Sequence, residues 1–285
     1  MRKHNLSLLT VALALAPIAA NALQYTAIDL GTLGGTLSFG FGINASGQVT
    51  GTARTSGDSA GHAFITDAVT HAMTDLGTLG GTSSRGQGIN ASGQVTGAAQ
   101  TASADFHVFI TDAATHKLTD LGTLGGTSGS GNGINDSGQV TGQANTANER
   151  SHAFITDAVT NKLIDLGTLS GSTFGSTFDR SQGRGINASG QVTGFSGDIF
   201  ENHGFLYTDG QMLDLNALLA LDAAALYTIV EGQGINDSGQ IVANGLVNAT
   251  GQRHAFLLTP VPLPAAAWLF LSALGGLGCT RRRIN

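Results

Sequence analysis

The sequence predicts an all-β fold, arranged as a five-bladed β-propeller. The string Gly-Ile-Asn recurs with its isoleucine at positions spaced by 46, 45, 52 and 49 residues, namely Ile43, Ile89, Ile134, Ile186 and Ile235. Each copy is followed by a His-centred apolar string, and four copies are then followed by an Asp-Leu string. Four short strands in a period of this length are typical of one propeller blade.

The composition agrees with short strands joined by tight turns. Of 285 residues, 42 are glycine and only 4 are proline, while charged residues make up 11 %. The apolar share of 41 % is enough for a packed core and argues against disorder. Glycine density and period-two alternation exclude helices over most of the chain.

The second repeat shows the strands expected in every unit. We expect an inner strand at 86–90, followed by strands at 94–99, 107–111 and 117–122. Asn90-Ala91-Ser92-Gly93 supplies the turn between the first two, because Asn and Gly tolerate left-handed backbone conformations. The Gly-rich first strand would lie innermost, where blades crowd the axis and side chains have least room.

The two ends of the repeat region predict closure of the ring. The fifth unit stops after its third strand, and its missing fourth strand is expected at 25–31, where Asp29-Leu30-Gly31 matches Asp75-Leu76-Gly77. An N-terminal strand that completes the last blade would close a ring of five. The alternative is a β-solenoid, which would instead require capping units.

The first residues predict a secretory signal peptide at 1–22. Arg2, Lys3 and His4 precede an apolar stretch, and Ala20 and Ala22 fit the small-residue pattern of a cleavage site. The alternative is a buried N-terminal helix.

The last residues predict a sorting tail at 261–285. An apolar run from Ala265 to Cys279 can just reach the length of a transmembrane helix and ends in three arginines. Together with the proline motif before it, this tail resembles the PEP-CTERM sorting signal of exported bacterial proteins. Its motif residues are Val261, Pro262, Leu263, Pro264, Arg281, Arg282 and Arg283. The resemblance implies an exosortase-type processing enzyme as a partner, and Leu263 stands where the commonest form has Glu. The alternative is a permanent tail anchor.

The repeats, which we place at 23–260, resemble the bacterial HAF family of extracellular repeats, on the strings DLGTLGG, GINxSGQVTG and HAF. The resemblance implies an exported repeat protein and no established activity. Between the terminal segments, eight bases stand against 19 acids, a net charge of −11. Such an acidic body argues against nucleic acid as a partner.

Two units carry longer loops, and we expect any ligand site there because function concentrates on loops that a rigid scaffold displays. Aromatic rings with a few carboxylates would suit sugar rings. The candidates are Phe174, Phe178, Asp179, Arg180, Asp198, Phe200, Glu201, Tyr227 and Glu231. The alternative is that these loops cover the channel as a satellite core.

Other repeated residues are expected to be structural. The five HAF histidines lie in separate blades, too far apart to share one metal ion, so no metal site is predicted. The Asp of each DLG string is expected to accept hydrogen bonds in a turn or at a ladder end. The G-x-G-I-N strings do not continue as a nucleotide fingerprint, and no cofactor is predicted.

The function expected from the sequence is a non-enzymatic structural, adhesion or binding scaffold at the cell surface or in the extracellular matrix. Exopolysaccharide is the expected associate, and a C-terminal helix would hold the chain in the membrane before processing. No catalytic residues are predicted. The alternative is a carbohydrate-active enzyme, which would need carboxylates that converge on the channel.

Overall fold

The computed structural model describes residues 25–169, 180–198 and 201–261. The predicted signal peptide, the tail from Pro262 onward, and the candidates Phe174, Phe178, Asp179 and Phe200 lie outside these residues. Among the described helices, none has the length and apolar character needed to cross a membrane.

The all-β prediction is confirmed, and each repeat forms an antiparallel sheet of consecutive strands. Unit 1 consists of β1 (Gly34–Ile43), β2 (Val49–Thr55), β3 (Gly61–Thr66) and β4 (Met73–Gly77), with the short 3-10 helix η1 (Ser56–Asp58). Unit 2 consists of β5 (Gly80–Ile89), β6 (Val95–Thr101), β7 (Phe106–Thr111) and β8 (Leu118–Gly122). Unit 3 consists of β9 (Gly125–Ile134), β10 (Val140–Thr146), β11 (Ser151–Thr156) and β12 (Leu163–Gly167).

The last two units differ at their ends. Unit 4 consists of β13 (Arg180–Ile186), β14 (Val192–Gly197), β15 (Asn202–Thr208) and β16 (Gln211–Asp214). Two short helices follow, α1 (Leu215–Leu218) and α2 (Leu221–Leu226). Unit 5 has three strands in the described structure, β17 (Tyr227–Ile235), β18 (Ile241–Val247) and β19 (Gln252–Leu258).

Each unit is a meander, as in a propeller blade, and not the coil of a solenoid. Units 2 and 3 are also joined through a single parallel pair, Phe106 with Ser128. The predicted turn is confirmed in unit 2. The Gly93 amide donates to the Asn90 carbonyl at 3.1 Å, and Gly93 has a φ of +82°.

The first strand of every unit carries a β-bulge at the central residue of its G-x-G string. In unit 2, Gly86 pairs with Gly97 and Gly88 with Thr96, which leaves Gln87 without an opposite residue. We call the five bulged residues the bulge row: Phe41, Gln87, Asn132, Arg184 and Gln233. A bulge redirects its side chain, so the G-x-G strings are explained by backbone geometry.

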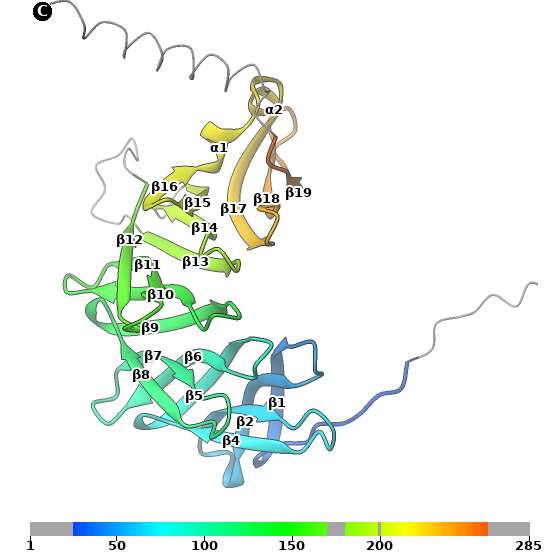
Figure 1. Ribbon diagram of the computed structural model, residues 1–285, viewed down its shortest axis with the longest axis vertical. Coiled ribbons are helices and arrows are strands. Elements are labelled where there is room, and N and C mark those ends of the chain that lie inside the picture. The colour runs from blue at the N-terminus through cyan, green and yellow to red at the C-terminus, as the bar shows by residue number, and fades with distance from the viewer. Residues whose placement is uncertain (1–24, 170–179, 199–200, 262–285) are drawn as a thin grey trace, which may run out of the picture.

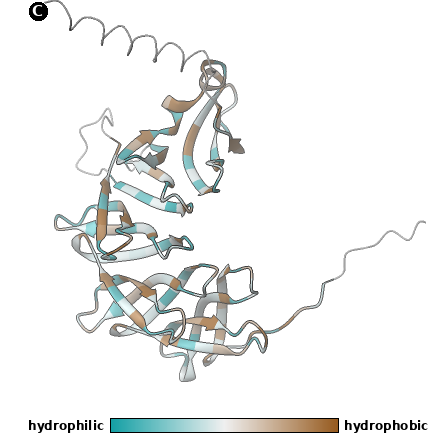
Figure 2. Cartoon of the chain, in the orientation of Figure 1, coloured by the Kyte–Doolittle hydropathy of each residue, from teal (hydrophilic) through white to brown (hydrophobic). Residues whose placement is uncertain are grey.

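The hydrophobic core is divided among the four interfaces between consecutive units. Each of four clusters combines buried residues of one unit with those of the next. Between units 2 and 3, for example, Val108 and Ile110 pack with Val140, Ala144 and Phe154. Figure 2 shows the same pattern, because apolar residues recur in every unit and are not gathered in one centre.

Polar contacts repeat at these interfaces as well. The Thr96 hydroxyl donates to the Phe109 carbonyl at 2.7 Å, and Gly131 of the next unit lies directly against that hydroxyl. The Asn90 amide group donates to the Asn135 carbonyl at 3.1 Å. Neighbouring units therefore meet through the same Thr–Gly and Asn–carbonyl contacts at each of the four interfaces.

The predicted closure of the ring is not found. Figure 1 shows the units along an open arc, with unit 1 at one end and unit 5 at the other. Residues 25–32 form no strand, and among the described strands β19 pairs with β18 alone. Tyr25 is 87 % exposed. The N-terminal segment therefore does not complete unit 5 within this chain, because the angles at the four interfaces leave the ends apart.

Candidate functional site

The bulge row defines a surface on the first strands where equivalent positions hold different residues. The residue two positions before each bulge belongs to the same surface, and these residues are Phe39, Arg85, Ser130, Gln182 and Glu231. Both sets vary in chemistry although the glycines between them do not. Because the side chains on this surface differ between units whereas the backbone and the glycines repeat, we take this surface as the candidate site.

Side chains of the bulge row reach the following unit, and each contact has its own chemistry. Arg85 lies over the Phe41 ring, with 5.6 Å from Cζ to the ring centroid. Gln87 donates to the Ser130 hydroxyl at 3.1 Å. Arg184 pairs with Glu231 at 3.1 Å and donates to Gln233 at 2.9 Å. The contact therefore differs in chemistry between the first, second and fourth interfaces along the arc.

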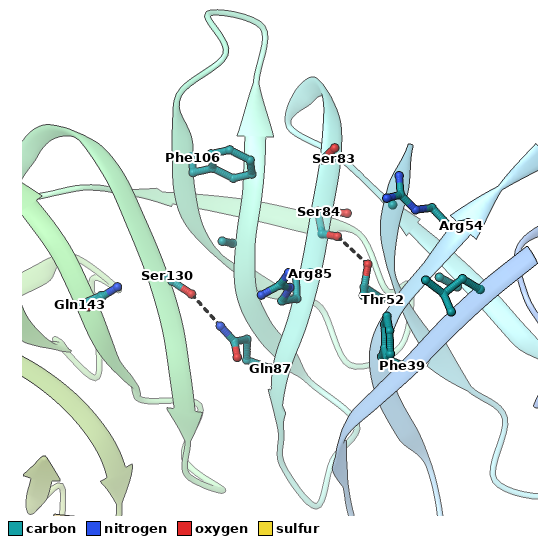
Figure 3. Close-up of a pocket in the computed structure, with 14 residues that line it drawn as sticks. Phe39, Thr52, Arg54, Ser83, Ser84, Arg85, Gln87, Phe106, Ser130 and Gln143 are labelled. Atoms are coloured by element: carbon teal, nitrogen blue, oxygen red, sulfur yellow. Dashed lines mark hydrogen bonds between the residues drawn. The ribbon is translucent and has the colours of Figure 1, made fainter. Parts of the chain in front are cut away.

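A pocket of about 530 Å³ lies on this surface across units 1 to 3. Its labelled side chains in Figure 3 come from β1, β2, β5, β7, β9 and β10. They include two phenylalanines, Phe39 and Phe106, and two arginines, Arg54 and Arg85. Gln87 and Gln143 add amide groups, and the lining contains no carboxylate. Pockets of this volume accept small organic ligands.

The aromatic and cationic groups of the pocket are available to a ligand. Phe39 is 51 % exposed and Phe106 is 38 % exposed, although both are large apolar rings. Among the described residues, neither Arg54 nor Arg85 forms an ion pair with a carboxylate. Exposed rings beside unpaired guanidinium groups are suited to a ligand with an apolar face and a negative charge.

The loop candidates predicted from the sequence lie in different places in the structure. Arg180 lies over the Phe195 ring at 5.4 Å, on the same surface as the bulge row. Glu231 is also on this surface, paired with Arg184 and hydrogen-bonded by Asn244 at 3.2 Å. These are two of the predicted candidates.

The remaining described candidates lie elsewhere. Asp198 is buried and accepts a hydrogen bond from the Glu201 amide at 2.9 Å. Tyr227 packs against Phe256 with ring centroids 5.1 Å apart. The predicted set is therefore not one site in the described structure.

The HAF histidines pair with the Asp of the DLG strings. His62, His107 and His152 lie 2.8–2.9 Å from Asp75, Asp120 and Asp165 across the third and fourth strands. Asp75 also accepts from the Gly77 amide at 2.7 Å. The predicted acceptor role of the aspartates is confirmed, and each of these three histidines has a carboxylate partner within its own unit.

His203 has two carboxylate partners. Its ring nitrogens lie 2.7 Å from Asp214 and 3.2 Å from Glu201. Burial acts to lower the pKa of His203, but the hydrogen bonds and charges of Asp214 and Glu201 raise it above the ordinary value of 6.5. The protonated form is therefore favoured in the folded state.

Stability is expected to fall as the pH rises through the pKa of folded His203. A raised folded pKa contributes stability that is complete below 6.5 and is lost above the folded value. Asp214→Asn, which can still accept the Asn216 amide at the start of α1, should remove this part of the pH dependence. Urea unfolding between pH 5.5 and 8.5 measures the effect. Asp209→Asn, in an exposed turn, is the control, and equal pH slopes in both variants would contradict the assignment.

Sequence reasoning missed the bulge row and the pocket. The available signal was the variable residue in each G-x-G-I-N string, together with the variable residue two positions earlier. Phe41 with Arg85, and Arg184 with Glu231, are complementary pairs that occupy these positions in consecutive repeats. Period-two patterns alone assign such residues to a strand face, whereas the bulge changes the face.

Comparisons with known proteins give structural neighbours alone. No family model matches the chain, and no curated protein matches it. A TolB candidate from Agrobacterium tumefaciens has a TM-score of 0.46 and 12 % identity, over 77 % of this chain and 73 % of that one. TolB from Acinetobacter baumannii has a TM-score of 0.44 and 9 % identity, over 78 % and 54 % of the two chains. Likeness at this level says nothing about ligand or activity.

Proposed function

We propose that this protein is an exported, non-enzymatic binding scaffold of the cell surface or extracellular matrix, and that its ligand is an acidic polysaccharide. The pocket across units 1 to 3 carries the proposal, because it combines exposed aromatic rings with two arginines that have no acidic partner among the described residues, and its lining as described holds no carboxylate. The repeated residues, in contrast, are used in contacts between units.

The chemistry of the pocket favours an acidic sugar. A pyranose ring has an apolar face that stacks on Phe39 or Phe106, while its hydroxyls bond to amides such as Gln87 and Gln143. A uronate carboxylate would pair with Arg54 or Arg85, and guanidinium groups bind carboxylates through two parallel hydrogen bonds. Hydrolysis of a glycosidic bond ordinarily uses two carboxyl groups, which this lining does not offer, so binding is proposed without cleavage.

Export rests on the two ends of the sequence. The segment 1–22 has the charge and apolar pattern of a signal peptide, and 261–285 has the three parts of a sorting tail. We infer that an exosortase-type enzyme processes the tail after transient anchoring in the inner membrane. A protein at the cell surface would meet matrix polysaccharide directly.

Binding and location test the proposal together. The fragment 23–260 is expected to bind uronate-containing polysaccharides and not neutral ones, and Phe39→Ala or Arg85→Gln should weaken binding about tenfold, which corresponds to about 1.4 kcal/mol. Arg253→Gln, on unit 5, is the matched control. Phe178→Ala tests the loop candidates.

Fractionation of cells that produce the full chain should find it outside the cytoplasm. Retention in the cytoplasm would reject export. Failure to bind any acidic glycan would reject the proposed ligand.

A further inference from the structure

Unit 5 exposes a face that the other units bury. Leu257 is 67 % exposed, whereas its equivalents in units 1 to 3, Ile65, Ile110 and Ile155, are at most 7 % exposed, and Leu206 of unit 4 is partly buried. Val242 is 46 % exposed, whereas the threonines at the same position of the four other units are fully buried. These residues lie on the side where each earlier unit meets the one that follows it. Unit 5 therefore presents the first half of an interface that occurs four times in this chain.

Unit 1 presents the second half of the same interface. Gly86, Gly131, Gly183 and Gly232 each lie against a threonine of the preceding unit, but the equivalent Gly40 meets only Val49 of its own unit. The asparagine link is also incomplete. Asn44, Asn90, Asn135 and Asn187 each donate to the carbonyl of the next unit's asparagine, whereas Asn236 donates to Gln240 alone among the described residues.

The N-terminal segment already has the conformation of a fourth strand's end. Asp29 accepts from the Gly31 amide at 2.9 Å, as Asp75 does from Gly77, and Gly31 has a φ of +74° where Gly77 has +73°. The Ser38 hydroxyl donates to the Gly31 carbonyl at 2.7 Å, in the same way that the fourth-strand ends of units 1 and 3 are held by the following unit.

Residues 29–33 thus contact unit 1 in the way that the end of a fourth strand contacts the unit that follows it. Leu33 bridges to Thr55, as Leu79 bridges to Thr101. What is absent from the described structure is a third strand beside this segment, with which a fourth strand would pair. Asp29 has no histidine partner in the described structure, and His254 of unit 5 has no aspartate partner there.

We propose that unit 5 of one copy docks on unit 1 of a second copy, and that residues 25–31 of the second copy add to β19 as its fourth strand. Addition of a strand to an open edge satisfies the free backbone groups of that edge. Val242 would then lie against Gly40 of the second copy, and His254 would pair with Asp29 of the second copy.

The occupant is a second copy because the arc does not bring the two ends of one chain together (Figure 1). Closure within one chain would require movement at interfaces that are each held by the same Thr–Gly and Asn–carbonyl contacts. Docking of a second copy uses the interface in its existing geometry. The contact is head to tail, so it forms rings or filaments and presents many pockets to one polysaccharide.

Cysteine cross-linking in the full chain, with Cys279→Ser throughout, distinguishes two copies from one. Copies carrying His254→Cys and copies carrying Asp29→Cys, with different tags, are expected to form a mixed dimer when co-expressed. Neither copy should form it alone. A chain with His62→Cys and Asp75→Cys, treated with the same short bifunctional thiol reagent as the other variants, is the internal control, because the parent side chains of this pair are in contact.

A charge on the docking face provides the second measurement. Val242→Glu buries an unpaired carboxylate in the proposed contact and should lower the yield of mixed dimer about tenfold or more. Val69→Glu, in a turn and 84 % exposed, should leave the yield unchanged. An internal cross-link in a chain carrying both His254→Cys and Asp29→Cys, without mixed dimer, would show closure within one copy and overturn the proposal. So would the absence of both products while the internal control forms. Neither result bears on polysaccharide binding.

Discussion

Phe154→Ala is expected to lower the free energy of unfolding by about 3–5 kcal/mol, the range for loss of a fully buried aromatic side chain. Phe154 is fully buried between units 2 and 3, among Val108, Val140 and Ala144. Its removal leaves a cavity at an interface that the surrounding strands cannot collapse without loss of their ladder bonds. Urea unfolding of the fragment 23–260, followed by circular dichroism, measures the change.

The matched variant is Phe256→Ala, at the same position of unit 5. Phe256 is only partly buried, and in the described structure unit 5 lacks the fourth strand that pairs with the third strand in the other units. At protein concentrations too low for association, this variant should lose clearly less stability than Phe154→Ala. Equal losses would contradict the expectation that the ring contributes less where it is only partly buried.

Gly131→Ala is expected to destabilise the chain by about 1–3 kcal/mol, the usual cost of overpacking. A Cβ at this position would press on the Thr96 hydroxyl and come within 2.9 Å of Val140. Thr96 cannot move freely, because its hydroxyl donates to the Phe109 carbonyl. Both the contact between units and the strand pairing beneath it would have to shift. The same unfolding measurement applies.

Gly40→Ala makes the corresponding change where no unit precedes. Its added Cβ would meet only Val49, at 3.3 Å. We expect stability to stay within about 0.5 kcal/mol of the parent chain, as for substitutions away from packed features. A loss as large as that of Gly131→Ala in dilute solution would argue against the interface description.

Local structure could be predicted well from the sequence, and the site could not. The repeat period, the strands of each unit and the Asn90–Gly93 turn depend on residues close together in the chain, so patterns of glycine and alternation are sufficient. The candidates on the long loops rest on residue type, and the structure places Arg180 and Glu231 on the bulge row surface but Tyr227 against Phe256. The pocket depends on residues of three units, which no local pattern relates.

The sequence by itself determined an all-β repeat with four-stranded units, a fifth unit without its last strand, and an Asp29-Leu30-Gly31 string that matches that strand. Only the tertiary structure decided that the units form an open arc and that the variable residue of each G-x-G string is turned onto a shared surface. The reason is that the bulges redirect side chains by changing strand register, and that the angles of four packed interfaces add up along the chain. That accumulated angle determines whether the two ends meet, and no single repeat encodes it.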